Sequence, residues 1–178
     1  MLYINDKGEY YNGGSIVIGD TRYLSPSEEI LAQAGYHPYV PTAEEQLAQA
    51  KVEKLSQVDA YDASLERFTI NGVPMWLGHE LRQQLKTSVE AYIATGAEAV
   101  TKWFNGMEFT FPCATWLQML AVLEVYAAEV LNATERHKAA INALESVEDV
   151  EQYDITEGYP EAVVFTPQML AAMAAPKL

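Results

Sequence analysis

Two Asn-Gly dipeptides, Asn71-Gly72 and Asn105-Gly106, constrain the fold of this chain more than any other feature. Each stands between two short apolar runs, in the segments FTINGVPMWL and TKWFNGMEFTF. Asn-Gly between strand-like residues predicts a two-residue β-hairpin turn, because both central residues of that turn need a positive φ angle. We therefore expect two β-hairpins, whose turns are defined by Asn71, Gly72, Asn105 and Gly106.

A two-residue turn fixes which residues of each hairpin share a face. In both hairpins one face is apolar, and a tryptophan, Trp76 or Trp103, points the other way. The expected apolar faces consist of Phe68, Ile70, Val73 and Met75 in the first hairpin and of Phe104, Met107, Phe109 and Phe111 in the second.

Each hairpin leads into a helical pattern. After the first, an apolar stripe of period 3.6 is expected to be buried and the residues between its members exposed, with Gly96 ending the helix. The stripe consists of Leu81, Leu85, Val89, Tyr92 and Ile93, and the expected exposed residues are Arg82, Gln83, Lys86 and Glu90. The second helix begins near Pro112 and is apolar around most of its circumference as far as Leu131. Such a helix is buried centrally or is covered by another copy of the protein.

A lone hairpin and a lone short helix are both marginal in water, so the two units are expected to cover each other. The fold class that follows is α+β: two tandem β-hairpin–helix units forming an antiparallel sheet packed by helices, with N-terminal strands and a connecting helix.

Turn and capping residues divide the rest of the chain. Ser25 is expected to cap a short helix that Gly35 ends, and Thr42 with Glu45 forms a capping box for a helix that runs to about Val58. The segment DAYDAS, residues 59–64, then marks a boundary. Four parts are expected: residues 1–40 as an N-terminal strand and helix arm, 41–60 as the connecting helix, 61–165 as the main α+β domain, and 166–178 as a C-terminal helical tail.

Charge limits the partners. The chain has 11 basic and 25 acidic residues, a net charge of −14. Nucleic-acid binding needs clustered Lys and Arg and is not expected. We expect no membrane partner either, because no apolar run approaches the length needed to cross a bilayer. Asp6, Lys7 and Glu9 stand where a signal peptide would need an apolar core.

The sequence has no pattern that predicts catalysis. His37, His79 and His137 lack metal-site spacing, and His137 is expected on a solvated helical face. Cys113 is interpreted as a small buried residue rather than a nucleophile. We expect a protein that is not an enzyme and has no catalytic residues, no bound metal and no cofactor.

Aromatic residues remain as candidates for protein contact, because tryptophan and tyrosine are enriched at interfaces. The interface candidates are Trp76, Trp103, Trp116 and Tyr126. The alternative for Trp76 and Trp103 is burial under the connecting helix or the N-terminal strands.

Several segments also resemble a known family: FTINGVPMWL, WFNGMEF, LQMLAVLEVYA, TERH and VEQYDITEGYP. Together they resemble a domain family of unknown function found in bacteriophages and in prophage regions of gut bacteria, matched over about residues 68–160. The family carries no reaction that can be transferred to this chain. The resemblance implies a phage particle, among its tail, fibre or head-decorating components.

The expected function is therefore that of a virion structural protein, which is made in the bacterial host cytoplasm and acts by self-association and docking to other phage structural proteins. The alternative is a non-virion phage assembly factor or tail-fibre chaperone. An enzyme or a host-defence antagonist is a third possibility that no group of polar residues supports.

Overall fold

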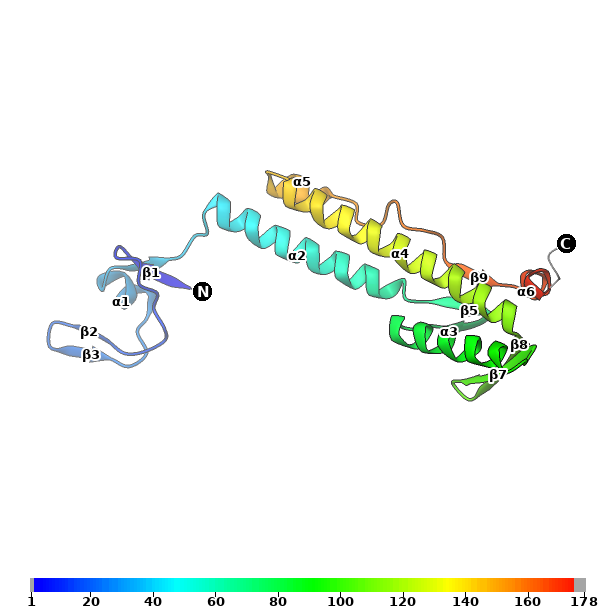
Figure 1. Cartoon of the computed structure of the whole chain (residues 1–178). Helices are drawn as coiled ribbons and strands as arrows, with labels where there is room; N and C mark the ends of the chain where they lie inside the picture. Colours follow the sequence, from blue (N-terminus) through cyan, green and yellow to red (C-terminus); the bar gives the residue numbers. More distant parts are fainter. Residues whose placement is uncertain (1, 175–178) are drawn as a thin grey trace. The chain divides into compact units, whose positions relative to one another are not determined.

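The computed structural model describes residues 2–174. Within them are six helices and nine strands, which confirms the α+β class (Figure 1). The chain divides into two compact units, Met1–Ala48 and Gln49–Leu178. The division into four parts expected from the sequence stays a prediction, and residues 175–178 of the expected tail lie outside the described residues.

The first unit is built from short strands around a small core. Strand β1 (Tyr3–Asn5) pairs antiparallel with β4 (Tyr36–Pro38), and β2 (Ile16–Ile18) forms a hairpin with β3 (Thr21–Tyr23). Helix α1 (Glu28–Gln33) adds Leu31 to a cluster with Tyr3 and Ile16.

The expected cap of α1 is wrong. Ser27 and not Ser25 is the N-cap, with the Ser27 hydroxyl accepting from the backbone N–H of Ile30 at 3.4 Å. The later start places Glu28 and Glu29 in the first turn, where the helix dipole favours acids.

Helix α2 (Ala43–Ser64) begins at the expected capping box but ends six residues later than expected. The backbone N–H of Glu45 donates to Thr42 Oγ1, and the backbone N–H of Thr42 donates to the Glu45 carboxylate. Residues 59–64 are helical because Val58 is fully buried and Asp62 hydrogen-bonds Thr134 from the last turn. Tertiary contacts therefore prolong the helix through a segment with no helical stripe of its own.

Both hairpins form in the expected register. Strand β5 (Phe68–Ile70) pairs with β6 (Val73–Met75), and β7 (Ala99–Phe104) pairs with β8 (Met107–Pro112). Asn71 and Asn105 have φ angles of 50° and 51°, and Gly72 and Gly106 follow with positive φ. The turn prediction is confirmed at all four residues.

The two hairpins do not share one antiparallel sheet, which is a correction to the finer prediction. Strand β9 (Val163–Phe165), from the C-terminal region, pairs parallel with β5, so the order is β6-β5-β9. The β7–β8 hairpin forms a separate two-stranded sheet. The physical reason is that both hairpins pack their apolar faces on one helix, α4, and β9 occupies the edge of β5 that the second hairpin would have needed.

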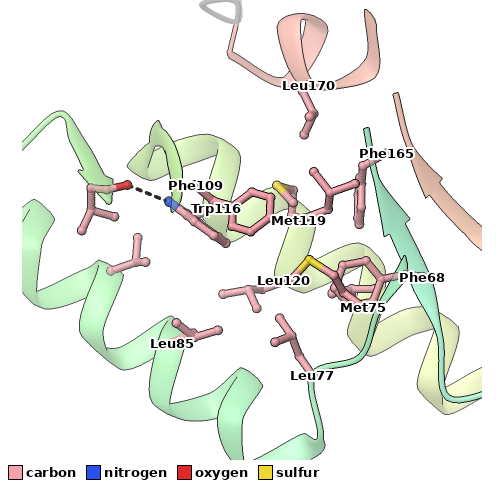
Figure 2. Close-up of a cluster of buried hydrophobic side chains, with 14 of the residues drawn as sticks. Phe68, Met75, Leu77, Leu85, Phe109, Trp116, Met119, Leu120, Phe165 and Leu170 are labelled. Carbon is pink, nitrogen blue, oxygen red and sulfur yellow. Dashed lines mark hydrogen bonds between the residues drawn. The ribbon is translucent and has the colours of Figure 1, made fainter. Parts of the chain in front are cut away.

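Helix α4 (Cys113–Ala143) carries the core of the second unit. Figure 2 shows its side chains among those of both hairpins, of helix α3 (His79–Ala94) and of helix α6 (Pro167–Ala174). Trp116 Nε1 donates to the Val100 carbonyl at 3.0 Å, which satisfies the one polar atom of that ring. The buried members of the cluster are Phe68, Ile70, Met75, Leu77, Leu85, Val89, Val100, Phe109, Cys113, Trp116, Met119, Leu120, Leu123, Phe165 and Leu170.

The expected orientation of α3 is partly wrong. Leu85 and Val89 are buried as expected, but Leu81, Tyr92 and Ile93 are exposed. Arg82, expected in solvent, is buried on the same side of the helix as Leu85 and Val89. Its guanidinium is buried because it hydrogen-bonds Glu124 and the Leu77 carbonyl. The buried face of helix α3 is therefore shifted around the helix axis from the expected apolar stripe toward Arg82.

Among the described residues, one helix, α4, is long and apolar enough to cross a membrane. The expectation that no apolar run reaches that length is wrong, since Gln118, Glu124 and Glu129 interrupt the run too sparsely. Length and composition alone are weak grounds for a membrane span, because core helices of soluble proteins meet the same criterion. The side chains of Trp116 and Met119 are packed against other parts of the chain.

The C-terminal region follows the capping signals. Helix α5 (Val147–Gln152) starts at Ser146, whose hydroxyl accepts from the backbone N–H of Asp149 at 3.1 Å.

Residues 49–64 of α2 lie antiparallel to α4 (Figure 1), as the ion pair between Asp59 and Lys138 and the hydrogen bond between Asp62 and Thr134 indicate.

Candidate functional site

A groove of about 480 Å³ lies in the second unit where three segments meet. One side is the end of α2 with the two residues that follow it, Leu65 and Glu66. Another side is the junction of β6 and α3, and the third is the middle of α4. We call this feature the groove. Its lining residues are Asp62, Leu65, Glu66, Trp76, Gly78, His79, Arg82, Glu124, Tyr126, Ala127, Ala128, Val130 and Leu131.

The polar centre of the groove is the ion pair between Arg82 and Glu124. Arg82 Nε donates to Glu124 Oε1 at 3.0 Å and Nη2 donates to Oε2 at 3.3 Å, a two-point contact that fixes both side chains. Arg82 Nη1 donates to the Leu77 carbonyl at 2.6 Å. The guanidinium also lies 5.4 Å from the centre of the Trp76 ring.

Glu124 stays ionised because of these neighbours. The hydrogen bond from Arg82 lowers the pKa of Glu124 below its ordinary value of 4.5, and a further hydrogen bond from Gln83 acts in the same direction. Gln83 Nε2 donates to Glu124 Oε1 at 3.0 Å, and His79 Nδ1 lies 3.9 Å from Oε2. The result is an ordered carboxylate at the meeting point of α3 and α4.

The walls of the groove are apolar and held in place. The Tyr126 hydroxyl donates to the Leu65 carbonyl at 2.9 Å, which joins α4 to the end of α2. Burial raises the pKa of Tyr126, so its hydroxyl remains a donor. Leu131 is 58% exposed although it lies on the helix that forms the core. Ala127 and Ala128 leave space beside it.

Two more carboxylates line the groove. The hydroxyl of Thr134 donates to Asp62 Oδ1 at 2.6 Å, whereas the Glu66 side chain is exposed. No basic side chain within residues 2–174 forms an ion pair with either. The nearby Lys138 pairs with Asp59 instead, at 2.8 Å. The groove is therefore acidic as well as apolar.

The four interface candidates lie in different environments. Trp76 is half-buried in the groove beside the end of α2, and Trp103 is 64% exposed on β7. Burial of both tryptophans under other elements is therefore wrong for Trp103. Trp116 and Tyr126 are almost fully buried within the chain, so their side chains are not available at a surface. A helix that is apolar nearly all round does not reveal which of its aromatics face inward.

Trp103 belongs to a second exposed feature, the outer face of the β7–β8 hairpin. All six alternating residues of this face are exposed: Ala99, Thr101, Trp103, Glu108, Thr110 and Pro112. The hydroxyls of Thr101 and Thr110 are 2.7 Å apart across the strands, so the face is ordered. Among the described residues, neither outer edge of this two-stranded sheet pairs with a further strand.

Sequence reasoning missed the groove and a second buried polar cluster. His137, expected in solvent, is buried: its Nε2 donates to the Glu157 carbonyl at 2.8 Å, and its Nδ1 lies 2.9 Å from the Tyr153 hydroxyl. Its ring also stacks on that of Tyr159, with centroids 5.2 Å apart. The charged neighbours of His137 in the sequence, Glu135, Arg136 and Lys138, led to the prediction of a solvated helical face. The three partners are 16 to 22 residues away in the chain, and no local pattern joins them to it.

Within the described residues no group of three or more His, Cys, Asp or Glu side chains is placed to hold a metal ion. Cys113 is buried, as expected for a structural residue, and its thiol lies 3.4 Å from the Ala97 carbonyl.

The chain has an α+β fold with two exposed features, the groove and the outer face of the β7–β8 hairpin. No family model, no curated protein and no solved structure matches the chain.

Proposed function

We propose that the chain is a structural component of a bacteriophage virion that acts by self-association and by docking to other virion proteins. The observation that carries the proposal is the exposed Trp103 on the ordered outer face of the β7–β8 hairpin. Tryptophan is enriched among the few residues that carry most of the binding energy at protein interfaces, which supports Trp103 as a contact residue. The resemblance over residues 68–160 supplies the phage context.

The hairpin suits self-association because its strand edges and its outer face are both open. Unpaired strand edges in the described structure can receive a strand from another chain. Most homo-oligomers are closed and symmetric, and two copies that pair through the same edge form a closed dimer. Thr101 and Thr110 flank Trp103 and add hydrogen-bonding groups to the contact.

The test is the mass of the purified protein in solution at micromolar concentration, measured by size exclusion with light scattering. We expect an oligomer, and we expect Trp103→Ser to dissociate it. Ile93→Ser is the control, because Ile93 is a large exposed apolar residue on a different element, α3. A wild-type monomer would contradict self-association, and equal loss with the control would contradict the role of Trp103.

The place of the protein in the particle needs a separate measurement. Mass spectrometry of purified particles should detect the chain in a fixed ratio to the other virion proteins. The net charge of −14 also suits an assembly factor that holds a basic partner temporarily. That alternative expects the chain in infected cells and not in purified particles.

A further inference from the structure

We propose that the groove binds a basic segment of a partner protein that inserts an apolar side chain next to Leu131 and places lysine or arginine against the rim carboxylates. This site is separate from the β7–β8 hairpin. It does not depend on the phage context or on self-association.

The first observation is the exposed Leu131. Most large side chains of α4 are buried, yet Leu131 is 58% exposed and lies beside the small residues Ala127 and Ala128 in the groove. Leu65 and Trp76 also line the groove and add to its apolar surface. An apolar side chain that enters here removes its own surface and that of Leu131 from water, which is favourable in proportion to the area buried.

The second observation is the charge. Three carboxylates, of Asp62, Glu66 and Glu124, line the groove together with the guanidinium of Arg82 and the ring of His79, which lies 3.9 Å from Glu124. Arg82 is fully engaged by Glu124 and by the Leu77 carbonyl and does not neutralise the other two acids. A lysine or arginine of a partner would therefore gain two carboxylates, of Asp62 and Glu66, that form no ion pair within residues 2–174.

The same charge argues against a second copy as the occupant. Each copy carries −14, so the approach of an average surface of this chain to the groove is repulsive. Among the basic groups around the groove, Lys138 pairs with Asp59 and also attracts Asp62, Arg67 acts on Tyr126, and His79 lies beside Glu124. Within residues 2–174 none of them forms an ion pair with Asp62 or Glu66. A basic partner is the occupant that the charge distribution favours.

The third observation is that the groove is already in shape. The hydrogen bond from Tyr126 to the Leu65 carbonyl and that from Thr134 to Asp62 fix the end of α2 against α4. The Arg82–Glu124 pair fixes α3 against the same helix. A rigid site loses little conformational entropy on binding. A volume of about 480 Å³ accommodates a few side chains rather than a whole folded domain.

The experiment measures fluorescence anisotropy of a labelled amphipathic peptide of alternating leucine and lysine pairs, about 12 residues long so that it can become helical. Its twin carries glutamate in place of every lysine. We expect the wild-type protein to bind the lysine peptide and not the glutamate peptide. Binding should weaken as salt is added, because the rim contacts are exposed to solvent.

Matched variants locate the binding. Leu131→Ser should weaken binding about tenfold, since one leucine contact is lost, and Glu66→Gln should reduce both the affinity and its salt dependence. The controls are Val125→Ser, a residue of α4 that is 59% exposed but does not line the groove, and Glu161→Gln, an exposed acid elsewhere. Both controls should bind like the wild type.

Three results would overturn the proposal. One is equal weakening by the controls, which would mean unspecific attraction to an acidic protein. Another is a wild type that does not bind the lysine peptide or binds the glutamate twin equally well. The last is dissociation of the oligomer by Leu131→Ser, which would make a second copy the occupant. Trp103→Ser should leave peptide binding unchanged, so the groove and the self-association can fail separately.

Discussion

Arg82 shows how one residue sets the position of a helix. Its side chain is 4% exposed, and burying a charge is tolerated only when partners replace water. Glu124 and the Leu77 carbonyl supply those partners. The helix therefore turns Arg82 inward with Leu85 and Val89, and leaves part of its apolar stripe in solvent.

The Arg82–Glu124 pair makes stability depend on pH. The pKa of Glu124 in the folded protein lies below its ordinary value of 4.5, so its contribution is complete above that value. The contribution is lost as the pH falls from about 4.5 through the lower, folded pKa. Glu124→Gln should therefore lower the melting temperature at pH 7, and the difference from wild type should shrink in this acid window.

The matched control is Glu129→Gln on the same helix, because Glu129 is exposed and forms no ion pair within the described residues. Melting curves by circular dichroism from pH 7 to about pH 3 make the comparison. A constant difference between Glu124→Gln and wild type across this range would contradict the prediction.

His137 is the second residue whose environment decides its role. Replacing it with phenylalanine keeps an aromatic ring next to Tyr159 but leaves the Glu157 carbonyl and the Tyr153 hydroxyl without their partner. We expect His137→Phe to lower the free energy of unfolding by about 2 kcal/mol, the effect of unpaired buried polar groups. Urea titration measures it. His37→Phe, at an exposed position, should change stability little, and a similar loss in both variants would refute the interpretation.

At the scale of the element, the hairpin turns depend on backbone conformation alone. Gly72 and Gly106 have φ angles of 81° and 76°, and an added Cβ would meet no atom within 4 Å at either position. Gly72→Ala and Gly106→Ala should therefore each destabilise the fold by about 1 kcal/mol through backbone strain. Gly78→Ala is the control, since Gly78 has a φ of −57° and equally open surroundings. Equal effects at the three glycines, measured by urea unfolding, would show that φ is not the cause.

Elements also differ in how their edges are used. Strand β5 is paired on both sides, by β6 and by β9, whereas the β7–β8 hairpin has no further strand among the described residues. The β7–β8 hairpin is instead stabilised by packing on one face only, where Phe104, Phe109 and Phe111 lie near Trp116. Its other face is the one on which the proposed contact depends.

At the scale of the whole molecule, net charge opposes self-association. Copies with −14 each repel one another, and dissolved salt screens that repulsion over about 10 Å at 0.1 M. If copies associate through Trp103, the oligomer should become tighter when NaCl is raised from about 50 mM to about 500 mM, where the screening length is shorter. Sedimentation velocity at several concentrations measures the dissociation constant.

A wild-type oligomer that weakens with salt would contradict this prediction and would indicate an interface held by opposite charges. Trp103→Ser, as a monomer, should show no salt dependence of mass. Binding of the lysine peptide to the groove should respond to salt in the opposite direction, which distinguishes the two contacts.

The sequence alone determined the local features. Asn71-Gly72 and Asn105-Gly106 fixed both turns and the register of their strands, and Thr42, Gly35 and Ser146 marked helix boundaries. These signals need only neighbouring residues, because positive φ and capping are decided within four or five positions of the chain.

Only the tertiary structure decided which elements meet. The pairing of β9 with β5, the burial of Arg82 and His137, and the groove beside Leu131 all join residues that are far apart in the chain. The residues next to a three-residue strand or a charged side chain do not indicate which distant segment it will pair with. Such choices follow from the packing of the whole core around α4, which balances apolar burial against the pairing of every buried polar group.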